Sequence, residues 1–308
     1  MKIIKNPNEA LNELSRIEDR TNFENNKDIS LLVSNILQEV KRDGDKAVEK
    51  FTNKFDGYHP SPIQVSQNEL KEAWNSTESN LKKALEKAQE RIIKFHEKEI
   101  PKSFSIQGES GDFMERKWMP VKRAGLYIPG GRAAYPSTVL MNSIPAKVAG
   151  VKEISMVSPG NQSGHVNKTV LAAAYLTGID KVYRIGGAQA IGAMAFGTNT
   201  INKVDVISGP GNIYVTTAKK LIYGSTGIDS LAGPSEILII ADHTAKSIHI
   251  ASDLLAQAEH DPLASSILLT TSMEQAKEVI IEINKKLKNH PRKEICEESI
   301  KNWGLIVV

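Results

Sequence analysis

The chain has 308 residues, of which 40% are hydrophobic and 24% charged, and its formal net charge is +3. These values are ordinary for a globular protein with a substantial core, and they do not suggest a nucleic-acid-binding surface. No apolar run approaches the roughly 18 residues that a membrane-spanning helix needs, and the polar, partly acidic N-terminus does not resemble a secretory signal. With a single cysteine, Cys296, an intrachain disulfide is impossible, so we expect a cytoplasmic protein without nucleic acid or a membrane as partner.

The first 120 residues are predicted to be mostly helical. Apolar residues recur at helical spacing over residues 29–55, with an interruption at Asp43-Gly44. Residues 67–101 predict one long amphipathic helix, or two, ending before Pro101. A charged passage with glycines then covers residues 105–118.

From Ala124 onward, short apolar runs alternate with helical runs. This alternation indicates βαβ units and parallel sheets, and the near-continuous apolar character indicates strands that are buried on both faces. The strand-like runs are residues 124–129, 153–158, 181–186, 204–209, 235–242, 265–271 and 303–308.

The last run, GLIVV, is an apolar strand with no helix after it. Either this strand joins a sheet and is covered by another element, or it is left bare because the chain lacks a C-terminal part. We favour the second interpretation.

Glycine-rich loops follow three of the predicted strands. Each loop alone is equally well explained as a tight turn, and none completes a G-x-G-x-x-G pattern. The carboxyl ends of parallel strands meet at one edge of a sheet, where open α/β folds bind ligands, so the three together favour a ligand site. The loops contain Tyr127 with residues 129–131, residues 186–187 with Gln189, and residues 209–211 with Asn212.

The stretch DLLAQAEHDP places potential metal ligands at the end of a predicted helix. Gln257 and His260 are three residues apart, so they share a face and lie about 4.5 Å apart along the helix axis. Imidazole and amide oxygen are acceptable zinc ligands, but zinc takes three or four protein ligands. The alternative is that His260 is only a favourable cation near a helix C-terminus.

Several long runs carry a family resemblance. They are residues 44–57, 125–131, 183–198, 209–212 and, most extensively, 227–262 (GIDSLAGPSEILIIADHTAKSIHIASDLLAQAEHDP). These runs closely resemble the signature segments of histidinol dehydrogenases, and the resemblance extends from about residue 20 to the last residue.

The resemblance implies a zinc- and NAD-dependent enzyme of histidine biosynthesis. Such an enzyme oxidises L-histidinol through L-histidinal to L-histidine, as a homodimer with one zinc ion per subunit. It further implies that Gln257 and His260 are zinc ligands that also face the substrate, and that Ser235 contacts the substrate. Tyr127, Gln189 and Asn212 match the positions that contact NAD.

The sequence departs from the family pattern in one respect. The family's proton-transfer pair is a Glu-His dipeptide in a PEH motif, which does not occur from Gly233 to Val308. Two further zinc ligands, an Asp and a His, also belong to that later part. We therefore expect a C-terminally truncated chain, inactive or nearly so, that contains no catalytic acid/base residue.

The pattern and the resemblance together predict an α/β fold with two Rossmann-like parallel-sheet domains. An N-terminal helical segment, residues 1–19, is expected to precede a discontinuous first domain, residues 20–123 plus 236–308, left incomplete at the C-terminus. The inserted second domain is expected over residues 124–235. Two alternatives remain: a dehydrogenase of another polar alcohol, and a non-catalytic remnant that retains NAD binding.

Overall fold

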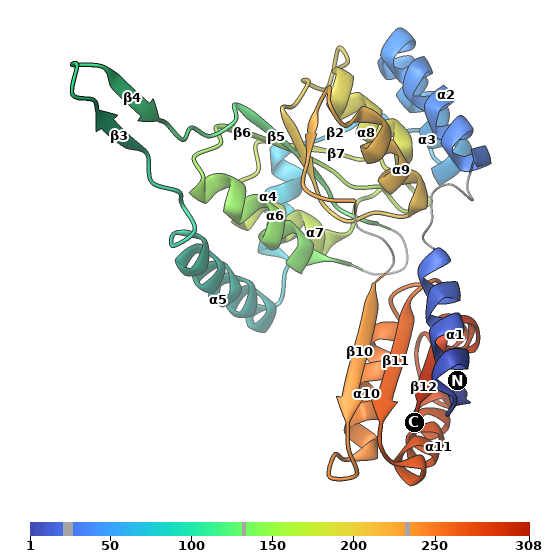
Figure 1. Ribbon diagram of the computed structural model, residues 1–308. Helices are drawn as coiled ribbons and strands as arrows, with labels where there is room; N and C mark the ends of the chain where they lie inside the picture. The colour runs from blue at the N-terminus through green and yellow to red at the C-terminus, as the bar shows by residue number, and fades with distance from the viewer. Residues whose placement is uncertain (21–26, 131–133, 232–234) are drawn as a thin grey trace. The chain divides into compact units, whose positions relative to one another are not determined.

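The computed structural model describes residues 1–20, 27–130, 134–231 and 235–308 (Figure 1). The chain divides into two compact units, one formed by Met1–Lys27 with Ala232–Val308 and the other by Asp28–Leu231. Both units contain parallel strands with helices packed on them, which confirms the predicted α/β class. In these described ranges, no helix is long and apolar enough to span a bilayer.

The larger unit begins with four helices, which confirms the helical character of the first part of the chain. The first two are separated at Gly44, where the sequence predicted an interruption. The segment from residue 67 forms two helices rather than one, and Ser66 caps the first of them by accepting a hydrogen bond from the Glu69 N–H at 3.1 Å. These helices are α2 (Lys27–Asp43), α3 (Asp45–Asp56), α4 (Gln67–Asn75) and α5 (Ser79–His96).

A six-stranded sheet forms the centre of this unit. Its order is β2-β7-β6-β5-β8-β9, and the short strand β2 is the antiparallel one. The strands are β2 (Gln64–Val65), β5 (Arg123–Tyr127), β6 (Glu153–Val157), β7 (Lys181–Tyr183), β8 (Val206–Ser208) and β9 (Gly227–Ile228).

Helices cover both faces of this sheet. Because successive strand residues point to opposite faces, Leu126 belongs to one hydrophobic cluster and Tyr127 to the other. The Tyr127 side of the sheet packs against α2, α3, α8 and α9, and the Leu126 side against α4, α6 and α7. The helices that connect the parallel strands are α6 (Pro136–Val148), α7 (Lys168–Leu176), α8 (Gly187–Phe196) and α9 (Ile213–Ile222).

The division into units differs from the one expected from the sequence. Residues 28–123 were assigned to a first domain together with 236–308, but they belong to the same compact unit as the sheet of residues 123–228. The physical reason is packing: α2 and α3 share a core with α8 and α9, α4 packs on α7, and β2 pairs with β7.

An antiparallel hairpin formed by β3 (Phe104–Gln107) and β4 (Phe113–Arg116) projects from this unit (Figure 1). All eight strand residues are exposed, including Phe104, Ile106, Phe113 and Met114. The sequence indicated only a charged passage here, because the strands are short and lack a buried face.

The smaller unit contains a parallel sheet of order β1-β12-β11-β10. Its helices α10, α11 and α12 share a core with one face of the sheet, and α1 packs on the other face. The elements are β1 (Lys2–Ile4), α1 (Pro7–Asp19), β10 (Glu236–Ala241), α10 (Ser247–Ala258), β11 (Ser265–Thr270), α11 (Met273–Leu287), α12 (Lys293–Trp303) and β12 (Gly304–Val307).

The expectation that the last strand is bare is wrong. Strand β12 lies between β1 and β11, with Leu305 packed against α1 and Ile306 buried in the cluster on the other face. The sequence interpretation missed β1, a three-residue strand placed within residues 1–19, which were expected to be only helical. Strand β1, near the start of the sequence, therefore pairs with β12, near its end, in one sheet.

This packing predicts the effect of truncating Leu305. Its side chain is 0% exposed, so Leu305→Ala should destabilise the smaller unit by about 2–5 kcal/mol through lost burial and a residual cavity. Ile240 on β10 is 72% exposed, and Ile240→Ala serves as the control with little change. Urea denaturation followed by circular dichroism measures both, and equal stability of the two variants would contradict the packing of β12 against α1.

Candidate functional site

The strand order of the larger unit reverses next to β5. From β5 the chain passes through α6 to β6 and then through α7 to β7, and α8 carries it back to β8 on the other side of β5. Helices α6 and α7 lie on one face and α8 and α9 on the opposite face (Figure 1). In open α/β sheets such a reversal leaves a crevice outside the carboxyl ends of the two central strands, where ligands bind.

The loops after β5 and β8 touch at this point. Gly209 follows β8 with φ of 122°, and a Cβ on it would lie 2.1 Å from the backbone oxygen of Tyr127. Only glycine tolerates both that backbone conformation and that close approach. The contact therefore fixes the distance between the two strand ends that flank the reversal.

Asn212 begins α9 immediately after this contact. Its side-chain oxygen accepts hydrogen bonds from the N–H groups of Tyr214 and Val215, each at 3.1 Å, as an N-cap does. The remaining N–H groups of the first turn point toward the same edge of the sheet, where they favour an anionic group.

Tyr127 joins the β5 end to the loop after β7. The Tyr127 hydroxyl accepts a hydrogen bond of 3.1 Å from the N–H of Gly187, the first residue of α8. Burial raises the pKa of Tyr127 to about 12, so the hydroxyl stays protonated at neutral pH and keeps its own proton to donate. Gln189 lies in the same first turn, and its Nε2 donates to Asp56 Oδ2 at 3.4 Å.

The structure thus brings the three glycine-rich loops to one edge of one sheet. The side chains of Tyr127 and Gln189 are buried and that of Asn212 is exposed. Gly131, which the sequence interpretation included, lies outside the described residues, as do residues 232–234 of the signature segment.

An ion pair between Lys219 and Asp229 binds the backbone of the Gly209 loop. Lys219 on α9 is 3% exposed, and its Nζ contacts the Asp229 carboxylate and donates to the Gly209 carbonyl at 3.0 Å. Asp229 also accepts a 2.8 Å hydrogen bond from the Gly209 N–H. Burial alone would raise the pKa of Asp229, but hydrogen bonds from Gly209, Lys219 and Ser230 outweigh it and lower that pKa. Sequence reasoning missed this pair, because its members are ten residues apart on different elements.

In the smaller unit, Gln257 lies in the last turn of α10 and His260 in the turn that follows it. The backbone N–H of His260 donates to the Gln257 carbonyl at 3.2 Å. His260 is exposed, whereas the Nε2 atom of Gln257 is buried without a hydrogen-bond partner among the described residues. Glu259, between them, pairs instead with His290, at 3.5 Å between Oε2 and Nε2.

Ser235 lies at the same edge of this sheet as the end of α10. It precedes β10, and its carbonyl accepts a 3.1 Å hydrogen bond from the N–H of Ser265, the first residue of β11. This edge is formed by the N-terminal ends of β10 and β11, and we call it the amino edge. Arg20 stabilises it by donating hydrogen bonds to the Leu263 carbonyl at 2.9 Å and to Glu236 at 2.8 Å. The Ser235 side chain is exposed there.

Gln257 and His260 fit part of a zinc site. The imidazole of His260 is exposed and available as a ligand at this helix end, whereas Gln257 would have to bind through Oε1, because its buried Nε2 is an N–H donor. Among the described residues, no group of three or more His, Cys, Asp or Glu side chains is arranged to hold a metal ion. A complete tetrahedral site needs one or two more protein ligands than this pair supplies.

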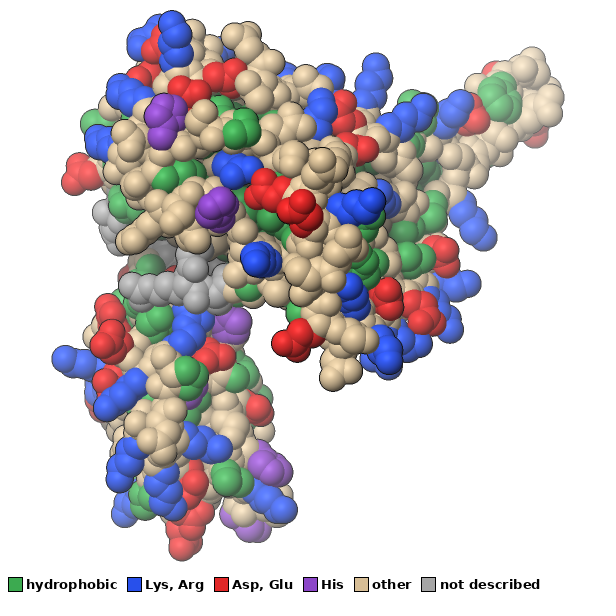
Figure 2. All heavy atoms as spheres, turned by 180° about the vertical axis from the view of Figure 1, so that it is seen from behind, with side chains coloured by type: hydrophobic (Ala, Val, Ile, Leu, Met, Phe, Trp, Pro, Cys, Tyr) green, Lys and Arg blue, Asp and Glu red, His purple; other side chains and the backbone are tan. Residues whose placement is uncertain are grey.

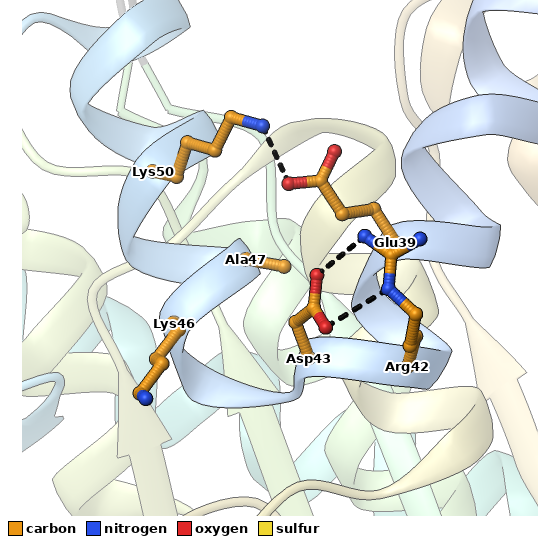
Figure 3. A pocket seen from close by; sticks show the side chains of 6 residues that line it. All are labelled: Glu39, Arg42, Asp43, Lys46, Ala47 and Lys50. Carbon is orange, nitrogen blue, oxygen red and sulfur yellow. Dashed lines mark hydrogen bonds and ion pairs between the residues drawn. The ribbon is translucent and has the colours of Figure 1, made fainter.

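A surface hollow between α2 and α3 is a weaker candidate (Figure 3). Its charged side chains pair with one another: Lys50 lies 2.5 Å from Glu39, and Arg42 lies 2.7 Å from Asp43. The pairs are exposed and contact no glycine-rich loop, so we interpret the hollow as a solvated surface.

The Lys219–Asp229 pair predicts how the Gly209 loop depends on charge. Lys219→Met should leave Asp229 partly buried without its cation and lower the free energy of unfolding of the larger unit by roughly 1–3 kcal/mol. Because folding lowers the pKa of Asp229, its stabilising contribution is present above its unfolded pKa and is lost as pH falls through the lower folded value. Denaturant unfolding at pH 7 and under acidic conditions measures this, and a variant as stable as the wild type at pH 7 would contradict it.

Comparisons with known proteins agree with one another. The family model described as histidinol dehydrogenase matches residues 19–308. A histidinol dehydrogenase of Prochlorococcus marinus (strain MIT 9312) is 73% identical over the whole chain, which covers 70% of that relative's length. The corresponding protein of Prochlorococcus marinus subsp. pastoris (strain CCMP1986 / NIES-2087 / MED4) is 74% identical, with 72% of its length covered.

A solved structure shows the same relationship in three dimensions. The crystal structure of histidinol dehydrogenase from Elizabethkingia anophelis matches the whole chain with a TM-score of 0.85 and 37% identity, and the chain covers 71% of it. By its sequence and its fold, the chain belongs to the histidinol dehydrogenase family.

Proposed function

We propose that the crevice beside β5 and β8 binds NAD, and that the chain serves the oxidation of L-histidinol through L-histidinal to L-histidine. The observation that carries this proposal is the convergence of three glycine-rich strand ends on the reversal point of one parallel sheet. The family match over residues 19–308 favours histidinol over another polar alcohol, and it favours an enzyme over a non-catalytic remnant.

The residues around the crevice have distinct roles in this proposal. The helix N-termini of α8 and α9 direct N–H groups toward the cofactor's pyrophosphate. Tyr127, which is protonated at neutral pH, donates a hydrogen bond, and Gln189 and Asn212 contact the cofactor through their amides. The contact between Gly209 and the Tyr127 carbonyl keeps these groups in register.

At the amino edge of the smaller unit, Gln257 and His260 would hold zinc, and Ser235 would contact the substrate. Zinc, when bound, would supply a Lewis acid that orients the amino alcohol. The exposed imidazole of His260, at the same helix end as Gln257, supports this assignment, because imidazole is a common zinc ligand.

The proton acceptor is the part of the reaction that these residues do not provide. No PEH motif occurs from Gly233 to Val308, and a positioned general base contributes roughly 10²–10⁴ in rate. We therefore propose that the 308-residue chain binds NAD but turns over histidinol at most slowly.

This proposal predicts the outcome of an assay of NADH formation. With L-histidinol, NAD and added zinc at alkaline pH, the chain alone should give no measurable turnover. A fusion that adds the part of the Prochlorococcus marinus (strain MIT 9312) relative not covered by this chain should turn over. Robust zinc-dependent turnover by the chain alone would place the base within these 308 residues, with His243 and Glu259 as the first candidates. A fusion protein without activity would favour a non-catalytic remnant.

We further propose that the chain forms a homodimer through the β3–β4 hairpin. A two-stranded hairpin without a covered face is marginally stable in water. This one opposes Ile106 to Met114 and Gln107 to Phe113, with apolar side chains among charged ones on the projecting arm (Figure 2). The hairpin of a second copy carries the same apolar side chains. Two copies related by a two-fold axis can therefore bury these side chains against each other.

The dimer proposal is tested with substitutions on the hairpin. Replacing Phe113 and Met114 together by Ser should shift the sedimentation coefficient from that of a dimer to that of a monomer, because the shared apolar surface is lost. Leu11 on α1 is similarly exposed, and Leu11→Ser is the matched control. A hairpin variant that remains dimeric would rule out this interface.

A further inference from the structure

Asp56 is a carboxyl group beside the loops that we propose to bind NAD, and neither the sequence nor the family resemblance gave it a role. It is the last residue of α3 and is partly buried. Its Oδ2 accepts the hydrogen bond from Gln189 Nε2, at 3.4 Å, over the first turn of α8. Asp56 therefore lies where the loop after β7 meets the helix that follows it.

The surroundings of Asp56 disfavour a negative charge. Burial raises the pKa of Asp56 to about 6. Its position at a helix C-terminus adds an unfavourable dipole, because that end of a helix favours cations. Retaining such a group inside the chain costs free energy, and uncompensated carboxyl groups of this kind cluster at functional sites.

The neighbouring groups do not supply a compensating cation. Titratable groups that interact with Asp56 are the hydroxyls of Tyr58 and Tyr127, both neutral at pH 7 because burial raises each pKa to about 12. The Tyr58 hydroxyl already makes two other hydrogen bonds: it donates to the Arg184 carbonyl at 2.8 Å and accepts from the Gly160 N–H at 2.7 Å. The Arg184 guanidinium pairs with Glu69 at 2.8 Å, and no ion pair joins Asp56 to a lysine or arginine in the described ranges.

Hydrogen-bond donors from a ligand would satisfy this carboxylate. The vicinal hydroxyls of a ribose offer two O–H donors to the two oxygens of one carboxylate, and dinucleotide sites at the ends of parallel strands use an acidic residue in this way. A phosphate on the same ribose would instead place a second negative charge against Asp56, at a point where burial weakens solvent screening.

We propose that Asp56 accepts hydrogen bonds from a ribose diol of the bound dinucleotide and thereby selects NAD against NADP. The inference rests on the proposed function, since it requires a dinucleotide in the crevice. Gln189 has a positioning role here: its amide orients the carboxylate, and Asp56 in turn fixes the amide.

Equilibrium binding of NAD and of NADP to the 308-residue chain, measured by calorimetry, tests this inference. Asp56→Asn should weaken NAD binding by roughly tenfold to hundredfold, the effect of losing charge-assisted hydrogen bonds, and should weaken NADP binding less or strengthen it. The ratio of the affinity for NAD to the affinity for NADP should therefore fall. Asp43→Asn, in the exposed hollow of Figure 3, is the matched control and should change neither affinity.

The pH dependence of NAD binding to the unmodified chain gives a second readout that needs no variant. The ionised carboxylate binds the diol, so NAD affinity should be greatest well above pH 6 and should fall as pH drops through about 6 and Asp56 becomes protonated. NAD is the suitable probe, because the additional phosphate of NADP itself titrates near pH 6. In Asp56→Asn this fall should disappear.

The outcomes separate the inference from the proposed function. If the unmodified chain binds neither dinucleotide at any pH, the proposed function fails. If it binds NAD, but the affinity is unchanged from pH 5 to 8 or Asp56→Asn keeps the same NAD preference, the role of Asp56 is overturned. A variant that fails to fold, as shown by circular dichroism, leaves the pH profile of the unmodified chain to decide.

Discussion

The close approach of Gly209 to the Tyr127 carbonyl is the constraint on which the proposed dinucleotide site depends. It joins the ends of β5 and β8 at the point where the sheet changes direction, and a Cβ at residue 209 would lie 2.1 Å from that oxygen. Everything proposed for the crevice uses this spacing: the start of α9 at Asn212, the hydroxyl of Tyr127, and the first turn of α8 to which that hydroxyl is bonded.

Interactions at some distance along the chain support this constraint. Lys219 and Asp229 bind the carbonyl and the N–H of Gly209, so the loop cannot move without breaking its hydrogen bonds to this ion pair. On the other side, the partly buried Asp56 is placed against Gln189 at the end of α3. The charge of Asp229 is balanced by Lys219, and this pair fixes the Gly209 loop. The carboxyl group of Asp56 is bonded only to the Gln189 amide among the described hydrogen bonds, so it is suited to accept further hydrogen bonds from a ligand.

Much of this organisation could be predicted from the sequence, because it depends on local patterns. Alternating apolar runs indicated the parallel sheets, and glycine-rich loops such as residues 209–211 indicated the ligand edge. The missed features depend on contacts between distant segments: β1 pairs with β12 across the whole chain, and Asp56 meets Gln189 across 133 residues. The assignment of residues 28–123 to the wrong unit has the same origin, because helix periodicity does not show which sheet a helix covers.

Hydrogen–deuterium exchange of the 308-residue chain with and without NAD tests the central claim, that the dinucleotide binds at the reversal point of the larger unit's sheet. We predict that NAD slows exchange in residues 127–130, in the first turn of α8 from Gly187 and in the first turn of α9 from Ile213, with little change in β10 and β11. Saturating NAD that protects the smaller unit instead, or protects none of these three segments, would contradict it.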